Sequence, residues 1–227
     1  MTISISARCG ETGMLGAAIA SSSICVSSRC IWAEAGVGVV ATQNVTDPCL
    51  GIDGLIHMKK GLNATSALKT LTEQAEHISW RQLALVDHDG KTAYFGGGNM
   101  LGLNNVAEGT DCIAAGNLLS SEEVPSIMVN SFLKTQGRII HLAQRLLATL
   151  ETGRDAGGEA GPMHSAGLLV MDTQPWPLVD LRVDWKDEDP IGGLRALWES
   201  YKNEMDDYVL RALNPDSAPS YGVPGNP

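Results

Sequence analysis

The order in which strand-like and helix-like segments follow one another is the feature that most constrains the fold of this chain. Residues 2–8 (TISISAR) alternate apolar and small polar side chains, the period-two pattern of a half-buried strand. Other segments space their apolar residues three and four apart, as an amphipathic helix does. In chain order the predicted segments are strands at 2–8, 14–21, 25–28 and 36–43, helices from 47 and from 63, a hairpin over 81–97, helices from 121 and over 138–150, strands at 166–171 and 178–183, and a last helix over 190–213.

This order favours one architecture over its main competitor. A doubly wound parallel sheet needs a helix after each strand, and the chain does not supply one. Runs of antiparallel strands that alternate with helix pairs predict an α+β fold, a four-layer αββα sandwich with two sheets inside and helices outside. We expect residues 1–213 to form a single αββα domain, and the Pro-, Ser- and Gly-rich residues 214–227 to be a flexible C-terminal tail.

Capping and turn residues support these boundaries. Asp47 precedes Pro48, the arrangement of an N-cap and a first helical residue. Asn63 can cap the following helix in the same way. The pair Asp89-Gly90 between two strand-like runs is the strongest short-range signal for a hairpin turn in the chain.

Composition excludes several classes of function. The formal net charge is −10, and no stripe of Lys or Arg with interleaved aromatic residues runs through the sequence, so we expect no nucleic-acid partner. No apolar run reaches the roughly 18 residues that a membrane span needs, so we expect no membrane partner. The first residues lack the basic flank and apolar run of a signal peptide, which predicts a cytoplasmic protein.

Residues that could bind a metal or a cofactor are scattered along the chain. The 5 cysteines include no CxxC pair, and the 5 histidines show no HxH or HxxxH spacing. The glycines at 96–98 are not followed by the Lys-Ser/Thr of a phosphate-binding loop. We therefore expect no metal, no cofactor, and cysteines in the form of reduced thiols.

Several stretches, spread over about residues 1–200, together form a recognisable pattern. They are MTISISARCGETGMLGAAIAS, WAEAGVGVVATQN, DPCLGIDGLIHMKKGLNATSAL, RQLALVDHDGKTA, AAGNLL, HSAGLLV and VDLRVDW. Together they resemble a family of uncharacterised bacterial proteins, the domain of unknown function 1028, whose fold is that of the N-terminal-nucleophile hydrolases. The resemblance implies an αββα sandwich and an ancestry among amide-bond hydrolases, with an activity that the family as a whole leaves unassigned.

The chain departs from the family pattern in one place. The family tends to show an arginine shortly before the Gln/His-Ser-Ala step, whereas this chain has Glu159–Met163 (EAGPM) there. If that arginine binds an acidic group of the substrate, the substrate of this chain differs.

Thr2 is the candidate catalytic residue. Its side chain is small enough for an aminopeptidase to remove Met1, which would leave Thr2 as the first residue. A threonine hydroxyl needs a base, and a terminal α-amine with a pKa of about 7.7–8 can supply one. The alternative is a β-branched residue that merely begins a strand, as most threonines at the second position do.

Polar residues at two predicted strand ends are candidates for the substrate and oxyanion pocket. Thr42, Gln43 and Asn44 end one strand just before a predicted helix start, where backbone N–H groups could face the nucleophile. They could equally satisfy the free donors of that helix. Asn117 could bring side-chain donors to the same pocket, although asparagine is also a common turn residue.

His164 and Arg182 complete the candidate pocket. His164 precedes Ser165, but neighbours on a strand point to opposite faces, so we do not expect a serine–histidine triad. Arg182 shares one strand face with Asp180 and Asp184. These three charges form either a solvated ion-pair ladder or an anchor for an anionic substrate.

The leading hypothesis is a hydrolase of a small amide or amino-acid derivative that uses Thr2 as its nucleophile. Threonine enzymes of this fold often carry a lysine beside the nucleophile, and the corresponding region 30–34 (CIWAE) has none. The alternative is therefore a non-catalytic ligand-binding or assembly protein that retains the hydrolase fold. We expect a small-molecule substrate as partner, and a homo-oligomer, because sandwich proteins expose sheet edges and helix faces that commonly pair.

Overall fold

The structure, a computed structural model, describes residues 1–223 as strands, helices and two short 3₁₀ turns. The strands are β1 (Thr2–Arg8), β2 (Leu15–Ser21), β3 (Ile31–Glu34), β4 (Gly38–Asn44), β5 (Arg81–Asp87), β6 (Thr92–Gly96), β7 (Asn104–Gly109), β8 (Cys112–Asn117), β9 (Ser165–Met171) and β10 (Val179–Val183). The helices and turns are α1 (Val26–Cys30), α2 (Pro48–Lys59), α3 (Ala64–Gln74), η1 (Ile78–Trp80), α4 (Val124–Leu133), α5 (Leu142–Asp155), α6 (Pro190–Tyr201), α7 (Met205–Leu213) and η2 (Pro215–Ser217).

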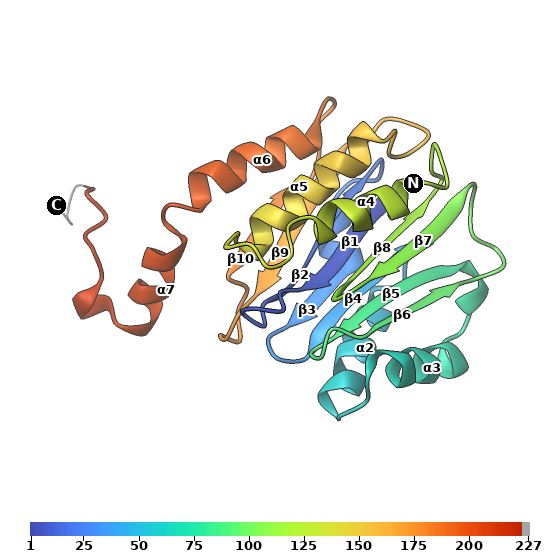
Figure 1. Cartoon of the computed structure of the whole chain (residues 1–227), viewed down its shortest axis with the longest axis horizontal. Helices are drawn as coiled ribbons and strands as arrows, with labels where there is room; N and C mark the ends of the chain where they lie inside the picture. The colour runs from blue at the N-terminus through green and yellow to red at the C-terminus, as the bar shows by residue number, and fades with distance from the viewer. Residues whose placement is uncertain (224–227) are drawn as a thin grey trace.

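Two antiparallel sheets form the centre of the molecule (Figure 1). The first has the strand order β10-β9-β2-β1-β8-β7, and the second has the order β3-β4-β5-β6. In the first sheet Thr2 lies opposite Ser21 of β2 on one side and opposite Asn117 of β8 on the other. The start of β1 is therefore flanked by a neighbouring strand on both sides.

Three clusters of buried hydrophobic side chains lie between the four layers of helices and sheets. Helices α4, α5 and α6 pack on the outer face of the first sheet, and α2 and α3 pack on the outer face of the second. A third cluster, which includes Ile19, Ala41 and Ile113, lies between the two sheets. The αββα sandwich that the sequence predicts is therefore confirmed.

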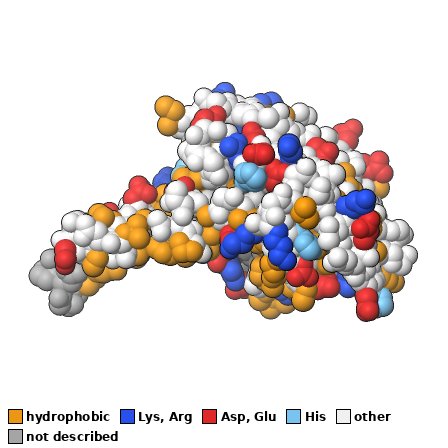
Figure 2. All heavy atoms as spheres, turned by 90° about the horizontal axis from the view of Figure 1, so that it is seen from below, with side chains coloured by type: hydrophobic (Ala, Val, Ile, Leu, Met, Phe, Trp, Pro, Cys, Tyr) orange, Lys and Arg blue, Asp and Glu red, His pale blue; other side chains and the backbone are white. Residues whose placement is uncertain are grey.

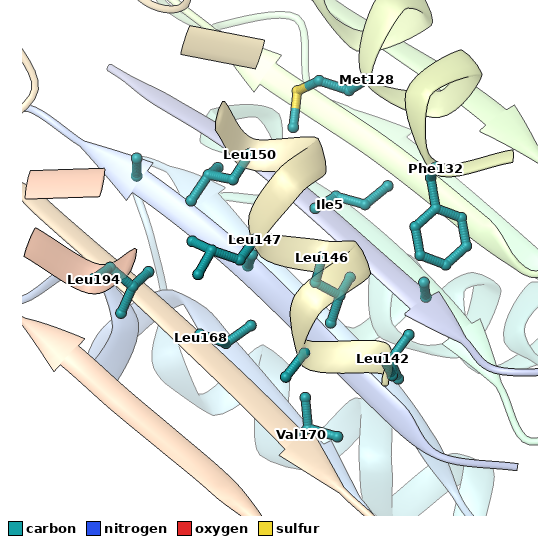
Figure 3. Packing of buried hydrophobic residues seen from close by; sticks show 14 of the residues in the cluster. Ile5, Met128, Phe132, Leu142, Leu146, Leu147, Leu150, Leu168, Val170 and Leu194 are labelled. Atoms are coloured by element: carbon teal, nitrogen blue, oxygen red, sulfur yellow. The ribbon is translucent and has the colours of Figure 1, made fainter. Parts of the chain in front are cut away.

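In strand β1 the period-two pattern of the sequence determines which side chains face the helices and which face the second sheet. Ile3 and Ile5 are fully buried in the cluster under the helices, and Figure 3 shows Ile5 among side chains of α4 and α5. Burial of such a side chain stabilises the fold by roughly 1.5–3 kcal/mol. Thr2, Ser4 and Ser6 have the opposite parity, and they therefore face the second sheet.

The helix starts predicted at Asp47 and Asn63 and the predicted hairpin turn are confirmed, whereas the helices expected from 121 and over 138–150 are α4 and α5, which begin at Val124 and Leu142. A carboxylate oxygen of Asp47 accepts the N–H of Cys49 at 3.0 Å at the start of α2. The side-chain oxygen of Asn63 accepts the N–H of Ser66 at 2.9 Å at the start of α3. Gly90 takes a φ of 85° in the turn that joins β5 to β6, a conformation that glycine adopts without strain.

Two sequence predictions are wrong. The strand expected at 25–28 is instead helix α1, because Val26 and Cys30 lie one helical turn apart and both face the core between the sheets. The single last helix expected over 190–213 is divided into α6 and α7. Tyr201, the last residue of α6, donates a hydrogen bond to the carbonyl oxygen of Leu178, and the chain turns after this contact.

A C-terminal arm, which we define as residues 205–223, extends away from the sandwich (Figure 1). Figure 2 shows hydrophobic side chains along this projection, and among them Tyr208 is 42% and Leu213 is 55% exposed. The guanidinium of Arg211 lies 4.0 Å from the ring centre of Tyr221, which ties part of the predicted tail to α7. Residues 224–227, the end of that tail, lie outside the described residues.

Candidate active site

Polar side chains line one end of the space between the two sheets. They are Thr2 and Ser4 of β1, Ser21 of β2, Gln43 of β4, Gln82 of β5, Asn117 of β8 and Ser165 of β9. Each is at most 5% exposed. Further along the same space the inward-facing residues are apolar, such as Ala17 and Val39. Because buried polar groups are costly unless they are hydrogen-bonded, their concentration at one end marks it as the candidate site.

The Thr2 hydroxyl converges with a second hydroxyl on a single carbonyl oxygen. Thr2 Oγ1 donates to the carbonyl oxygen of Met1 at 2.5 Å, and Ser21 Oγ donates to the same oxygen at 2.5 Å. The two hydroxyl oxygens are 3.4 Å apart. Ser21 Oγ also accepts the N–H of Ser23 at 3.0 Å, which fixes the position of the second hydroxyl.

A network of carboxamides lies behind these hydroxyls. The side-chain oxygen of Gln82 accepts from the amide of Gln43 at 2.8 Å and from the amide of Asn117 at 2.9 Å. Ser4 Oγ donates to the side-chain oxygen of Gln43 at 2.9 Å, and the Gln82 amide donates to the hydroxyl of Tyr94 at 3.2 Å. The network joins both sheets, and its mutually fixed groups hold the walls of the site in place.

Residues 159–164, which we call the roof segment, cover the start of β1. At one end of the segment the N–H of Ala160 donates to the carbonyl oxygen of Leu118, just beyond β8, at 2.9 Å. At the other end the N–H of His164 donates to the carbonyl oxygen of Ser21, the last residue of β2, at 2.8 Å. Because β1 lies between β8 and β2, the roof segment passes across the beginning of β1.

Glu159 brings a buried carboxyl group to this end of the molecule. The residue is 5% exposed, and one of its oxygens, Oε2, accepts the N–H of Ser22 at 3.2 Å. The other oxygen, Oε1, is buried without a hydrogen-bond partner among the described residues. Burial raises the pKa of Glu159 to about 7, against the opposing effects of the Met1 ammonium and of the Ser22 hydrogen bond.

Buried thiols do not compete with Thr2 as nucleophiles. Burial raises the pKa of Cys112 to about 12, and it also raises the pKa of Cys30. A raised pKa keeps a thiol protonated near neutral pH, and only the thiolate is a strong nucleophile.

Of the three predicted pocket residues at the end of β4, only Gln43 lies on the face of the second sheet that is turned toward Thr2. Thr42 shares the face of Val40, which packs toward α2 and α3, and its hydroxyl donates to the carbonyl oxygen of Asp47 at 3.2 Å. Asn44 joins two loops: its amide donates to Trp80 at 2.6 Å, and its oxygen accepts the N–H of Leu101 at 3.1 Å.

His164 and Arg182 are engaged on the outside of the site. The His164 ring stacks on Trp185 with 4.4 Å between the ring centres, at the end of the roof segment. Arg182 forms two hydrogen bonds of 2.8 Å with the carboxylate of Asp180 on the exposed strand β10. These bonds raise the pKa of the Arg182 guanidinium, and they correspond to the ion-pair interpretation of this strand.

Five residues of the site are not among the candidates from sequence: Ser4, Ser21, Gln82, Glu159 and Ser165. A signal for Ser21 was present, because a hairpin that turns at residues 9–13 brings the start of the first strand opposite the end of the second. Glu159 stood out only as a departure from the family pattern. For Gln82 the sequence holds no such signal.

While Met1 is in place, its carbonyl oxygen accepts the hydrogen bond of the Thr2 hydroxyl. A hollow of about 580 Å³ adjoins the roof segment, lined by Arg154, Pro162, Met163 and residues 187–191. Within residues 1–223 no three His, Cys, Asp or Glu side chains are grouped so that they could bind a metal ion. Nor does any helix in this range have both the length and the apolar character needed to cross a bilayer.

Comparisons with known proteins agree with the family resemblance. The family model described as "Family of unknown function (DUF1028)" matches residues 2–194. The crystal structure of SPO2555 from Silicibacter pomeroyi, a protein with the same family model, is 30% identical with a TM-score of 0.81, and the alignment covers 88% of this chain and 89% of that one. No curated protein matches the chain.

More distant solved structures also align over most of the chain. The Anbu (ancestral β-subunit) protein from Yersinia bercovieri is 10% identical with a TM-score of 0.41, and covers 90% of this chain and 96% of its own. Anbu from Hyphomicrobium sp. strain MC1 is 10% identical with a TM-score of 0.38, over 89% and 95% of the two chains. The family match spans Thr2, the carboxamide network and the roof segment, and it ends within α6. The chain therefore belongs to the DUF1028 family of unknown function.

Proposed function

We propose that this protein is a hydrolase of a small amide or amino-acid derivative, and that Thr2 becomes its nucleophile once Met1 has been removed. The observation that carries the proposal is the position of the Thr2 hydroxyl. It is buried at a polar end of the sandwich, and it already donates a 2.5 Å hydrogen bond to a carbonyl oxygen. The Ser21 hydroxyl lies 3.4 Å from the Thr2 hydroxyl and donates to the same carbonyl oxygen.

The proposed reaction uses groups that are present at this end of the chain. The free α-amine of Thr2 takes the proton of its own hydroxyl as Oγ1 forms a bond to the substrate carbonyl carbon. The Ser21 hydroxyl, which now donates to the Met1 carbonyl, donates to the oxyanion that develops. The amine then passes the proton to the leaving nitrogen as the C–N bond breaks, and water hydrolyses the ester on Thr2.

The first test is the state of the chain start. Intact-mass analysis of purified protein should give the mass without Met1, and that protein should hydrolyse at least one member of a panel of amides, ureides and acyl amino acids. Thr2→Ala should abolish this turnover. Retention of Met1 in an active preparation would eliminate the mechanism, because the base would then be tied up in a peptide bond.

A second candidate function is a ligand-binding or assembly protein without hydrolysis. The Thr2 hydroxyl contacts the Met1 carbonyl oxygen and the Ser21 hydroxyl, both neutral groups, in place of the lysine that threonine enzymes of this fold often carry. For assembly, the relevant feature is the C-terminal arm, with exposed Tyr208, Leu210 and Leu213.

The two candidates are separated by different measurements. A binding protein would keep its ligand affinity in Thr2→Ala and would have no turnover to lose. An assembly role of the arm predicts a homo-oligomer in sedimentation velocity that Leu210→Ser with Leu213→Ser converts to smaller species. A monomeric wild-type protein would rule out that role for the arm.

A further inference from the structure

Asn117, the last residue of β8, carries a buried oxygen atom that has no hydrogen-bond partner. The residue is fully buried, and its side-chain oxygen Oδ1 forms no hydrogen bond with any of residues 1–223. Its side-chain nitrogen donates to the side-chain oxygen of Gln82 at 2.9 Å. A buried acceptor without a donor costs free energy, and such atoms are rare in folded proteins. Oδ1 is therefore a candidate to receive a donor that the chain acquires later.

The carboxamide network determines that this free atom is an oxygen. The Gln82 amide nitrogen donates to the main-chain carbonyl oxygen of Gly116 at 2.9 Å, and a carbonyl oxygen only accepts. Gln82 therefore turns its own oxygen toward Gln43 and Asn117, and both of these residues present a nitrogen to it. The atom of Asn117 that remains is an oxygen, which accepts a hydrogen and cannot donate one to an oxyanion.

The main-chain nitrogen of Thr2 lies on the side of β1 that faces β8. The N–H and C=O groups of a trans peptide unit point in opposite directions, and the Met1 carbonyl oxygen accepts a hydrogen bond from Ser21 of β2. The Thr2 nitrogen therefore points away from β2. The 2.8 Å hydrogen bond from the Arg8 N–H to the Asp111 carbonyl oxygen agrees with this, because such bonds recur at every second residue of an antiparallel pair.

Thr2 and Asn117 lie directly opposite each other in the first sheet. The side chains of such a pair leave the sheet on the same face, with about 4.5–5.5 Å between their Cβ atoms. The main-chain carbonyl of Asn117 is thus the partner of the Thr2 N–H in the ladder, and its side chain stands beside that of Thr2. A free amine at the Thr2 nitrogen would have both acceptors of Asn117 within reach.

Removal of Met1 changes the number of hydrogens on this nitrogen. In the peptide bond the nitrogen carries one hydrogen, whereas a neutral α-amine carries two hydrogens and one lone pair. One hydrogen can stay with the main-chain carbonyl of Asn117, and the second needs a new acceptor, which Oδ1 supplies. The lone pair is then the position that remains, and the lone pair must take the proton of Thr2 Oγ1.

We infer that Asn117 is a positioning residue: after Met1 has been removed, its side-chain oxygen accepts a hydrogen of the Thr2 α-amine and so holds the amine for its task as a base. The inference rests on the proposed function for the removal of Met1 and for the role of the amine, but its test needs no turnover. It also changes the role of Asn117, whose side chain the sequence predicts to be a donor in the substrate pocket.

The direct test is a crystal structure of the wild-type protein that begins at Thr2, prepared by a protease that removes a leading fusion just before this residue. We expect the Thr2 nitrogen within about 3.2 Å of Asn117 Oδ1. A longer separation, with Oδ1 unpaired or bonded to water, would overturn the inference. This test does not depend on the folding of any variant.

A second test measures the pKa of the Thr2 amine by NMR titration of threonine-labelled protein that begins at Thr2. An acceptor binds an ammonium group more strongly than a neutral amine, so Asn117→Ala should lower this pKa by about one unit, a tenfold change in the acid dissociation constant. Asn117→Asp should raise it by at least as much. Two titratable groups that interact with a charge at the chain start, Glu159 and Cys30, are the same in every variant. An unchanged pKa in both variants would overturn the inference.

Gln43→Ala is the matched control. Gln43 and Asn117 each donate one hydrogen bond to the Gln82 oxygen, at 2.8 and 2.9 Å, but the oxygen of Gln43 is already paired with Ser4. Its loss should disturb the network to the same extent and leave the pKa of the Thr2 amine unchanged. An equal shift in Gln43→Ala and Asn117→Ala would mean that the network as a whole, and not Oδ1, acts on the amine, and would overturn the inference.

Turnover distinguishes failure of the inference from failure of the proposed function. If protein that begins at Thr2 hydrolyses a member of the amide panel, the acidic limb of its profile of kcat/KM against pH should move with the pKa of the amine in Asn117→Ala. Hydrolysis without the contact and without the shift overturns the inference alone. The contact and the shift without any hydrolysis overturn the hydrolase and leave the inference in place.

Discussion

The two ends of β1 each hold a buried charged side chain, but the two charges are held in different ways. Beyond Arg8, at the far end, Arg145 is 2% exposed, its Nε donates to Thr135 at 2.9 Å, and its guanidinium lies 4.1 Å from the ring centre of Phe132. At the near end Glu159 has a single hydrogen bond, from the N–H of Ser22, and its second carboxyl oxygen has no hydrogen-bond partner among the described residues.

The two charges differ in the number of their contacts: Arg145 contacts Thr135, Phe132 and Cys9, although its Nη2 has no hydrogen-bond partner among the described residues, whereas Glu159 has one hydrogen bond. The partners of Arg145 belong to α4, to the turn after it and to Cys9 just beyond β1, and loss of Met1 would change none of them. Removal of Met1 would take its ammonium group away from the surroundings of Glu159, whereas the hydrogen bond from Ser22 would remain. We therefore expect substitutions at the Arg145 end to change stability alone, and substitutions at the Thr2 end to change chemistry as well.

The largest effect expected is the loss of turnover in Thr2→Ala. Removal of a nucleophile costs about 10⁴-fold or more in kcat, whereas the free energy of unfolding should change by less than about 1 kcal/mol. Ser6→Ala is the matched control, because Ser6 lies on the same face of β1 and its buried hydroxyl has no partner among the described residues. Steady-state kinetics should show full activity for Ser6→Ala, and an equal loss in both variants would contradict the assignment of Thr2.

The second prediction concerns the other end of the strand. Arg145→Ala should lower the free energy of unfolding by about 4 kcal/mol, because it leaves a cavity against Phe132. Turnover per folded molecule should be unchanged. Urea denaturation followed by circular dichroism measures the first quantity, and Arg145→Met, which keeps most of the volume, should recover at least half of the loss. A stable but inactive Arg145→Ala protein would remove the distinction between the two ends.

The third prediction uses the pKa of Glu159, which is raised from 4.5 to about 7 by burial. Between these pH values the folded state binds more protons at this residue than the unfolded state does, so stability falls as the pH rises. The full effect is on the order of 3 kcal/mol and is complete above pH 7. Urea denaturation between pH 4.5 and 8 should show this decrease in the wild type and in Glu108→Gln, the control at an exposed residue of β7, and its absence in Glu159→Gln. If the free energy of unfolding changed with pH in the same way in all three proteins, the result would contradict this prediction.

The smallest effect expected is the loss of stability when one polar contact is removed at either end of β1. Ser21→Ala and Cys9→Ala should each cost about 1 kcal/mol of stability, because each removes one hydrogen-bonding side chain. Only Ser21→Ala should also slow turnover, by about 10²-fold, as loss of an oxyanion donor does. Single-turnover measurements on both variants decide this, and an unaffected rate in Ser21→Ala would remove Ser21 from the proposed mechanism.

The sequence predicts the layers of the fold because the layers follow from local periodicity. The alternation in TISISAR fixes which residues of β1 face the helices, and the caps at Asp47 and Asn63 fix two helix starts. The hairpin of β7 and β8 was not foreseen as a pair, although Asn117 was placed at a strand end. Its strands carry mixed residues such as Asn104 and Glu108, which follow no clean alternation.

Less of the site could be predicted, because it is assembled by contacts between distant parts of the chain. Thr2, Gln43 and Asn117 were candidates, and the structure brings all three to the polar end. The pairing of Glu159 with this end depends on the bridge between residues 119 and 159, which no local pattern encodes. Thr42 is the opposite case, a sequence candidate that lies outside the site. It directly precedes Gln43 on β4, so its side chain points to the other face of the sheet, toward the outer helices.

The roof segment has a practical consequence for anyone who prepares this protein. Because it crosses from β8 to β2 beside the first residues, an affinity tag fused ahead of Met1 would begin next to this crossing. A tag at the other terminus would start from the projecting arm, far from the crossing in Figure 1. A tag that stays ahead of Met1 would also keep the Thr2 amine in a peptide bond, so the proposed mechanism predicts an inactive protein.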